Sequence, residues 1–413
     1  MLYYYNLNGR IACSELDSLP YPQIEAPEKC NELYFLFRRP AADSRAAFAP
    51  HTAGQLFSKV ESCGMLNTNA LPNVQPDPLL KRMLALGKVR ALNVEHPRFE
   101  ENLRRTLHPA KCRVNILALG DVGGTLLTGL RLLGGDVISS IGICDISEQM
   151  AERWEMEANQ INYPWDYDSL PPVEVVTPER LFDCDMFVFV ASKGIPPVGS
   201  QVKDVRMAQF ETNRAIAVHY ARMAREKQFS GLYCQVSDPI DPLAKAVYLE
   251  SNRDENGVFD GKGLLPEQIQ GFGLGVMNAR AAYYAKKEKR YANFLTEGRA
   301  YGPHGKELVI ADSIENYNDA LSRELTRKAV EANLVVRGLG FKPYVAPALS
   351  SGALSLILTL RGEWHYGSVF LGGSFMGCKT RFTRMGQQVE ALPLPAPLFE
   401  RIAAAEAALK EII

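Results

Sequence analysis

Short apolar runs alternate with longer helical patterns between residues 113 and 263. The strand candidates are 114–119, 137–143, 173–177, 186–191 and 231–236. The helical patterns between them reach Leu133 and cover 148–160 and about 204–228. Strands that are apolar throughout and separated by helices are typical of a parallel sheet covered on both faces. The middle of the chain is therefore predicted to be an α/β domain with a doubly wound parallel sheet.

The first 112 residues have a different pattern. Asn8-Gly9 is a strong turn pair, and the segments on either side of it, 2–5 and 10–13, predict a β-hairpin. Proline-rich connections follow, with a strand candidate at 32–37 and helical patterns near 78–86 and 98–107. The runs LYYYN and LYFLF would form an apolar patch if they were left uncovered. We therefore expect a small mixed α/β extension that packs on the rest of the chain or on a neighbouring subunit.

From residue 264 onward, helical and strand-like patterns are mixed. The helical patterns cover 275–292, 314–337, 349–360 and 398–412, and the strand-like pieces cover 307–311 and 363–371. This mixture predicts an α+β domain packed on the first one. The predicted division of the chain is thus 1–112, 113–263 and 264–413.

Composition and charge exclude several classes of protein. Across 413 residues, 46 Lys and Arg nearly cancel 47 Asp and Glu, so no bulk basic field would gather nucleic acid or an anionic membrane. No apolar run reaches the roughly 18 residues of a membrane helix, and the first residues do not resemble a secretory signal. The eight cysteines include no C-x-x-C pair and no Cys/His cluster. We expect a cytoplasmic protein with no nucleic-acid, membrane or metal partner.

The first apolar run of the α/β region ends in a glycine-rich turn. The sequence VNILALGDVGGT places Ala118, Gly120 and Gly123 in an A-x-G-x-x-G pattern where a helix begins. Small residues there allow a tight turn and let a pyrophosphate approach backbone N–H groups. The second run ends in Asp145, whose carboxylate can accept a hydrogen bond from a ribose 2′-hydroxyl and would repel a 2′-phosphate. The two features predict an NAD site; the alternative for Asp145 is a capping residue of the next helix.

Seven motifs follow one another over residues 113–413 in the order of the lactate/malate dehydrogenase family. They are ALGDVGGT, GICDIS, DCDMFVFVASKG, DVRMAQFETN, YCQVSDPIDPLAK, GFGLGVMNAR and AYGPHGKELVIADS. On these motifs residues 113–413 resemble that family, and the first 112 residues lie outside the resemblance. It implies a Rossmann-type NAD-binding domain followed by the family's α+β catalytic domain. By analogy, it also implies a homo-oligomer, either a dimer or a tetramer.

The resemblance implies roles for individual residues. His304 matches the catalytic acid/base, since an imidazole can give up and take back the proton that accompanies hydride transfer. Arg280 matches the arginine that clamps the substrate carboxylate, and Arg206 matches the one that polarises the reacting carbonyl. Asn213 is placed with the substrate-binding residues of the pocket. The alternatives are a histidine in a Gly/Pro turn, a surface arginine at 206 and a structural helix residue at 213. The implied cofactor-binding residues are Gly120, Asp121, Val122, Gly123, Asp145 and Ala191.

Several family positions hold other residues in this chain. The aspartate that orients the family's histidine falls on Met277, and the asparagine that donates to the substrate carbonyl falls on Asp238. The threonine that lines the pocket falls near Val345, and the substrate loop is longer than in typical members. Since Met277 cannot hold an imidazole, we expect Asp238 to be a catalytic residue that pairs with His304.

These residues predict an NAD-dependent oxidoreductase. It would transfer hydride between the nicotinamide and C2 of a small 2-oxo or 2-hydroxy carboxylate, with an atypical substrate. If Asp238 paired with a cationic amino or imino group, the substrate would be an amino or imino acid. A second class is a pseudoenzyme that binds a dinucleotide or a carboxylate without turnover. A third class is the NAD-dependent glycosidases, which share the fold but use a metal, and the sequence lacks closely spaced Cys/His/Asn ligands for one.

Overall fold

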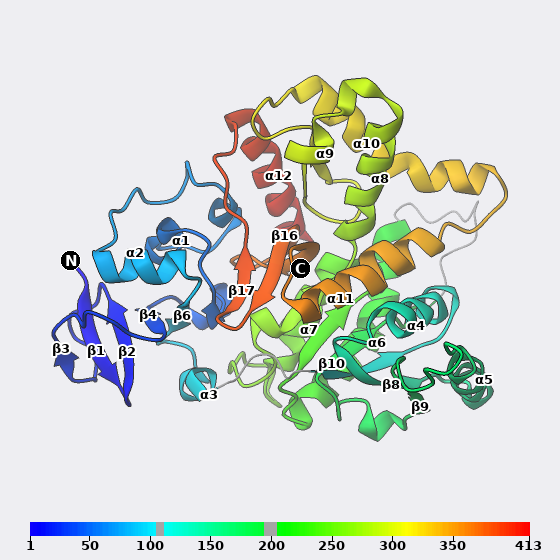
Figure 1. Cartoon of the computed structure of the whole chain (residues 1–413), viewed down its shortest axis with the longest axis horizontal. Coiled ribbons are helices and arrows are strands. Elements are labelled where there is room, and N and C mark those ends of the chain that lie inside the picture. Colours follow the sequence, from blue (N-terminus) through cyan, green and yellow to red (C-terminus); the bar gives the residue numbers. More distant parts are fainter. Residues whose placement is uncertain (105–110, 194–204) are drawn as a thin grey trace.

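A computed structural model describes residues 1–104, 111–193 and 205–413, with the side chains of the last range described from residue 209 onward. The described residues form sheets of six, nine and two strands. Figure 1 shows the six-stranded sheet, built by the start of the chain, at one end of the molecule. The nine-stranded sheet runs through the rest and carries the predicted site residues at one of its edges.

The nine-stranded sheet has the order β17-β16-β15-β12-β11-β10-β7-β8-β9. Its parallel strands are β7 (Cys112–Leu117), β8 (Ile138–Cys144), β9 (Val173–Val175), β10 (Met186–Phe189), β11 (Leu232–Gln235) and β12 (Ile269–Gly271). The antiparallel strands that continue it are β15 (His365–Phe370), β16 (Phe375–Thr383) and β17 (Gly386–Val389). Because β7 has β8 on one side and β10 on the other, the strand order reverses at β7.

Helices cover both faces of the parallel strands. Met186 and Val188 of β10 pack on the face covered by α4, α5 and α11, whereas Phe187 and Phe189 pack on the face covered by α6 and α7. These helices are α4 (Asp121–Leu133), α5 (Glu148–Asn159), α6 (Val205–Glu226), α7 (Ile240–Ser251) and α11 (Leu354–Arg361). Both faces of β10 are apolar because both are buried. The predicted doubly wound, Rossmann-type α/β fold is confirmed.

The residues after β12 add helices and a short strand pair to one end of the sheet. They form α8 (Leu274–Lys287), α9 (Phe294–Glu297), β13 (Arg299–Tyr301), β14 (Val309–Ala311), α10 (Asp319–Gly338), a π-helix (Pro347–Ala353) and α12 (Ala396–Ile412). The nine-stranded sheet does not break at the predicted boundary of 263/264, because β12 pairs with both β11 and β15. The nine-stranded sheet therefore continues across this boundary.

Residues 1–104 form the six-stranded sheet, in the order β3-β1-β2-β4-β6-β5. Its elements are β1 (Tyr3–Leu7), β2 (Arg10–Ser14), β3 (Gln23–Ile24), β4 (Leu33–Phe37), β5 (Ala47–Phe48), β6 (Val89–Asn93), α1 (Ala53–Phe57), α2 (Pro78–Ala85) and α3 (Phe99–Arg104). β1 and β2 form the predicted hairpin, with Asn8 and Gly9 at φ values of 52° and 86°. Two successive residues with positive φ are what a tight hairpin turn of this hand requires.

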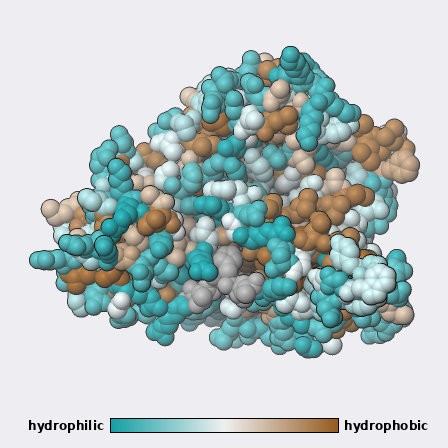
Figure 2. Space-filling model, viewed as in Figure 1, coloured by the Kyte–Doolittle hydropathy of each residue, from teal (hydrophilic) through white to brown (hydrophobic). Residues whose placement is uncertain are grey.

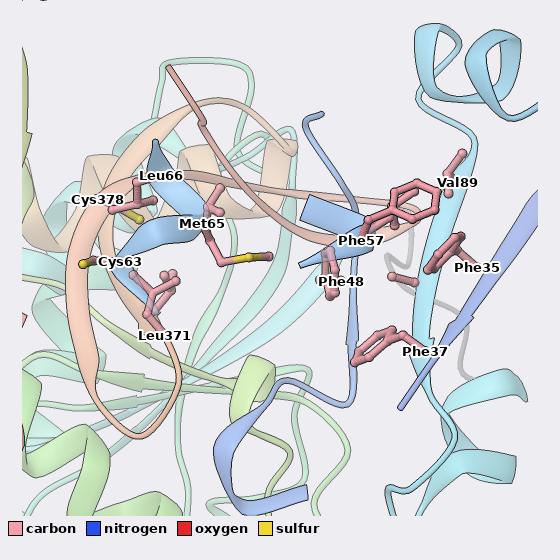
Figure 3. Packing of buried hydrophobic residues seen from close by; sticks show 14 of the residues in the cluster. Phe35, Phe37, Phe48, Phe57, Cys63, Met65, Leu66, Val89, Leu371 and Cys378 are labelled. Carbon is pink, nitrogen blue, oxygen red and sulfur yellow. The ribbon is translucent and has the colours of Figure 1, made fainter. Parts of the chain in front are cut away.

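One buried cluster joins the N-terminal sheet to the C-terminal strands. Phe35 of β4 belongs to the same cluster as Leu371 and Cys378 (Figure 3). The N–H of Ala49 also donates to the carbonyl of Gln387 at 3.0 Å, which connects the end of β5 to β17. The prediction that residues 1–112 pack on the rest of the chain is therefore confirmed for the residues that the structure describes.

The surface is hydrophilic over most of the face in Figure 2, with apolar residues gathered over α11 and the end of α10. Its exposed large apolar residues include Leu334, Val335, Leu339, Phe341 and Leu354. Within the described ranges, no helix is both long and apolar enough to cross a membrane.

Candidate functional site

The residues implied to bind the cofactor lie at the carboxyl ends of three neighbouring strands. Those at the start of α4, directly after β7, are Gly120, Asp121, Val122 and Gly123. Asp145 follows β8, and Ala191 lies just beyond β10. Ligands of open doubly wound sheets bind at this edge, where the strand order reverses. The fold thus brings residues that are far apart in the sequence to one edge of the sheet.

The turn between β7 and α4 leaves no room for a side chain at Gly123. A Cβ there would lie 2.0 Å from the carbonyl oxygen of Ala118, so only glycine lets the helix begin this close to the strand. Ala118 itself has a φ of 77°, a strained value for alanine that costs on the order of 1 kcal/mol. Gly120 is the N-cap of α4 and supplies no side chain to its first N–H groups. This turn suits the pyrophosphate of a dinucleotide.

Asp145 connects the backbone after β8 to the backbone after the neighbouring strand β7. Its Oδ2 accepts a hydrogen bond from the N–H of Leu119 at 2.7 Å, and its Oδ1 accepts one from the N–H of Ser147 at 3.0 Å. The N-cap of α5 is Ser147, whose hydroxyl accepts the N–H of Met150, so Asp145 does not cap this helix. Each oxygen keeps a further lone pair, so a ribose hydroxyl can still donate to it. The ribose contact stays a prediction.

The other implied cofactor residues have ordinary contacts. Asp121 forms an exposed ion pair with Lys342 at 2.9 Å, which ties the turn to the segment after α10. Val122 packs against the buried cluster on the α4 face, and Ala191 packs against the cluster on the α6 face. None of these contacts assigns a ligand.

His304 and Asp238 are in contact. The Nδ1 of His304 lies 3.1 Å from the Oδ1 of Asp238, and the two side chains are 19% and 46% exposed. Asp238 follows β11, and His304 lies between β13 and β14. Gly273, at the start of α8, permits this approach, because a Cβ there would lie 2.8 Å from the Cβ of His304. The geometry is that of a carboxylate that fixes an imidazole.

A second carboxylate, Asp241, lies behind the histidine. It accepts the hydroxyl of Ser368 at 2.7 Å and the backbone N–H of His304. Burial raises the pKa of Asp241 to about 6, although both hydrogen bonds and the nearby imidazole favour the charged form. Asp241 was assigned no role from the sequence, although it lies in the motif SDPID. Its signal was weak because an aspartate in the first turn of a helix is commonly only a favourable end charge.

Arg280 lies on α8 beside the pair. Its Nη1 donates to the carbonyl of Ala329 and to the sulfur of Met277, each at 3.4 Å. Burial lowers the pKa of Arg280, and the nearby Asp238 partly offsets this. Among the described residues, no carboxylate forms an ion pair with Arg280. A half-buried guanidinium without a paired carboxylate can bind an incoming anion.

Asn213 connects two strand ends. Its Oδ1 accepts the N–H of Lys193 at 2.9 Å, and its Nδ2 donates to the carbonyl of Asp238 at 2.7 Å. The residue is fully buried. These bonds are those of the structural alternative, since they hold Asp238 in position from behind. A direct substrate contact by Asn213 stays a prediction.

The three remaining expected positions are Arg206, Met277 and Val345. Arg206 is in the first turn of α6, but its side chain lies outside the described residues, as does the segment 194–204. Met277 is buried, with 1% of its surface exposed, so the family's usual carboxylate position is apolar here. Val345 is 51% exposed and lies just before the π-helix.

The doubly wound sheet and its glycine turn define an α/β protein of the Rossmann type. No family model matches the sequence, and no curated protein matches it. The structure of a lactate dehydrogenase from a Medee basin deep-sea metagenome library has a TM-score of 0.59 at 15% identity, covering 74% of this chain and 98% of that one. The minor L-lactate dehydrogenase of Enterococcus mundtii gives 0.59 at 16% identity, with the same two coverages.

A malate dehydrogenase of Archaeoglobus fulgidus, in complex with NADH, has a TM-score of 0.57 at 15% identity, covering 73% of this chain and 98% of that one. About three quarters of this chain therefore has the fold of lactate and malate dehydrogenases, the fold that the seven motifs predicted. At these identities the likeness defines the fold alone. Part of this chain has no counterpart in these structures.

Proposed function

We propose that this protein is an NAD-dependent oxidoreductase acting on a small 2-oxo or 2-hydroxy carboxylate. The observation that carries the proposal is the contact of His304 with Asp238, at 3.1 Å, on a lactate/malate dehydrogenase fold. A paired imidazole and carboxylate is the arrangement that moves a proton in step with hydride transfer.

The cofactor would lie along the glycine turn. The absence of side chains at Gly120 and Gly123, together with the carboxylate of Asp145, fits a dinucleotide without a 2′-phosphate. When bound, the nicotinamide would supply or accept the hydride at C2 of the substrate. We expect the protein to prefer NAD over NADP.

The substrate would be held by arginines and protonated by the histidine. Arg280 would clamp the carboxylate, and Arg206 would polarise the carbonyl of a 2-oxo acid. His304 would give its proton to the carbonyl oxygen and take it back in the reverse direction. Asp238 would fix the tautomer of His304 and stabilise the imidazolium. Asn213 would act as a positioning residue for Asp238.

One observation favours an amino or imino acid as the substrate. Asp238 is 46% exposed, and among the described residues only one of its oxygens has a hydrogen-bond partner. A neutral asparagine can donate to a carbonyl, whereas an ionised carboxylate can only accept. An imino or amino nitrogen that donates to Asp238 would satisfy the free oxygen.

Two other classes remain as rivals. A pseudoenzyme would bind NADH or a carboxylate without turnover. An NAD-dependent glycosidase would need a metal ion; within the described ranges, no group of three or more His, Cys, Asp or Glu could hold one. Turnover in a metal-free buffer would separate the proposed class from both rivals.

The proposed class is tested by following NADH oxidation with a panel of 2-oxo acids, with and without ammonia or methylamine. The expected result is turnover of at least one acid that falls about 100-fold or more in a His304→Gln variant. Turnover that needs the amine would select the imino-acid alternative. No turnover with any acid, together with intact NADH binding, would favour the pseudoenzyme.

We further propose that the protein is cytoplasmic and forms a homodimer or homotetramer. The exposed apolar residues over α11 and the end of α10, among them Phe341 and Leu354, support an oligomer, because burying them removes apolar surface from water.

A further inference from the structure

An open pocket of about 770 Å³ is lined in part by the residues that follow His304. Three elements form its walls: the residues that follow His304 and lead into β14, one face of α10, and α12. Its lining residues include Lys306, Glu307, Arg323, Thr326, Arg327 and Arg401. The roles proposed for the site residues do not involve this pocket.

Cations exceed carboxylates around the pocket. Arg323 forms an ion pair with Asp319 at 2.7 Å, and Arg401 lies 3.6 Å from the same carboxylate. Two guanidinium groups therefore share Asp319, and Arg401 also interacts with the nearby Asp312. The other two cations of the lining, Lys306 and Arg327, each have one carboxylate of their own. The two cations that share a carboxylate are thus Arg323 and Arg401.

Arg401 is held in place by neutral groups. Its Nη1 donates to the hydroxyls of Tyr317, at 3.0 Å, and Ser322, at 2.6 Å, and its Nη2 donates to the hydroxyl of Thr326 at 3.3 Å. The side chain is only 13% exposed. The hydroxyl acceptors orient the guanidinium toward the pocket wall, and its nearby carboxylates are Asp319, at 3.6 Å, and Asp312.

We propose that this pocket binds a small, multiply charged oxyanion, such as the phosphoryl group of a phosphorylated metabolite. The oxyanion would be a further counterion of Arg323 and Arg401, beside Asp319 and Asp312. Planar guanidinium groups match the oxygens of phosphate and carboxylate, and a partly buried position strengthens the attraction. This site is separate from the dinucleotide turn, which lies at the carboxyl ends of β7 and β8.

Binding of a ligand in the pocket would affect His304, the proposed catalytic histidine, through the backbone that connects them. Lys306 and Glu307 line the pocket two and three residues after His304. The N–H of Leu308 donates to the carbonyl of Gly305, so these residues form one short turn. A ligand that contacts Lys306 would therefore order the loop that carries His304.

The test is titration calorimetry of the full-length protein with inorganic pyrophosphate and with citrate, at constant ionic strength. We expect pyrophosphate to bind, and Arg323→Gln to weaken its binding about tenfold, the value of one charge-assisted hydrogen bond. Arg401→Gln should do the same. Stronger binding of pyrophosphate than citrate would indicate a phosphoryl ligand, and the reverse a polycarboxylate ligand. Both results support an oxyanion site.

Arg337→Gln is the matched control, because Arg337 is exposed in the last turn of α10 and does not line the pocket. It should bind pyrophosphate like the parent, and NADH should not displace the anion. If Arg401→Gln fails to fold, Arg323→Gln still tests the proposal, because the side chain of Arg323 is 62% exposed. Unchanged affinity in Arg323→Gln, displacement by NADH, or no binding at all would overturn the proposal.

Discussion

At the scale of single residues, the position of one carboxylate defines the candidate site. The lactate/malate dehydrogenase pattern has its orienting aspartate where this chain has the buried Met277, and an asparagine where this chain has Asp238. The Oδ1 of Asp238 lies 3.1 Å from the Nδ1 of His304. The carboxylate that contacts the imidazole therefore follows β11, whereas the expected position on α8 has none. The exchange keeps a partner for the imidazole and removes a donor for the substrate carbonyl.

Replacing Asp238 with Asn should lower kcat by about 100-fold or more, because an amide does not stabilise the imidazolium. Adding Met277→Asp in that background should restore part of the loss. Asn278→Asp, one position along the same helix, is the matched control and should restore nothing. Steady-state kinetics with the best acid of the panel measures these changes. An Asp238→Asn variant as fast as the parent would show that the pair does not take part in the reaction.

Asp241 predicts a pH dependence of stability. Its pKa of about 6 in the folded chain lies above its usual value of 3.8, so the folded state holds the proton more tightly than the unfolded state does. The resulting stabilisation is present below about pH 4 and is lost as the pH rises to about 6; it amounts to at most about 3 kcal/mol. Asp241→Asn should abolish this dependence.

Urea unfolding of the parent and of Asp241→Asn between about pH 4 and pH 7 measures the effect. As the pH rises, the free energy of unfolding of the parent should fall relative to that of Asp241→Asn. Asp168→Asn, at an exposed position, is the control and should give a constant difference. A constant difference for Asp241→Asn as well would mean that this carboxyl is not held protonated in the fold.

At the scale of elements, the apolar runs predicted the parallel strands well. The run 186–191 became β10, whose two faces are both buried, so continuous hydrophobicity was a reliable signal. β16 and β17 were not predicted as strands. β17 reads GQQV, and its buried glutamines are polar in sequence; the Oε1 of Gln388, for example, accepts from Arg381. Contacts that arise only from tertiary pairing leave no periodic pattern.

The candidate site was predictable to the extent that short motifs carry it. His304, Asp238 and the glycine turn were found from residues that lie near one another in sequence motifs. The roles of Asn213 and Asp241 were not, because each depends on backbone groups that are brought close only by folding. A hydrogen bond from a side chain to a distant main chain has no sequence signature.

Asp145, the residue after β8, predicts a preference of the protein for NADH over NADPH. If Asp145 accepts the ribose hydroxyl, the protein should bind NADH more tightly than NADPH, because a 2′-phosphate beside a carboxylate is repelled. Asp145→Ser should reduce the difference between the affinities for NADH and NADPH, although it also removes the acceptor for the N–H of Leu119. Calorimetry with both cofactors measures the preference. Equal affinity of the parent for NADH and NADPH would contradict the assignment of Asp145.

At the scale of the whole molecule, the N-terminal sheet and the C-terminal strands share one core. Phe57, Met65 and Leu66 are buried in the same cluster as Leu371 and Cys378 (Figure 3). Removing residues 1–112 would expose the C-terminal members of this cluster to water. The molecule is therefore expected to fold as a unit, even though its sheets are separate.

A chain of residues 113–413 should aggregate or lose its assembly. Light scattering and analytical ultracentrifugation, beside the full-length protein, measure the outcome. Deleting only the hairpin up to Ser14 is a milder comparison and should lower the melting temperature without aggregation, since much of the cluster stays covered. A soluble and fully assembled 113–413 chain would contradict the shared core.

The central claim, hydride transfer governed by His304, is tested most directly by isotope transfer. NADH carrying deuterium at C4 of the nicotinamide is incubated with the acids of the panel, and the products are analysed by mass spectrometry. We expect deuterium at C2 of a 2-hydroxy or 2-amino acid, formed at a rate that falls about 100-fold or more in His304→Gln. Absence of labelled product from every acid, or label transfer that His304→Gln leaves unchanged, would contradict it.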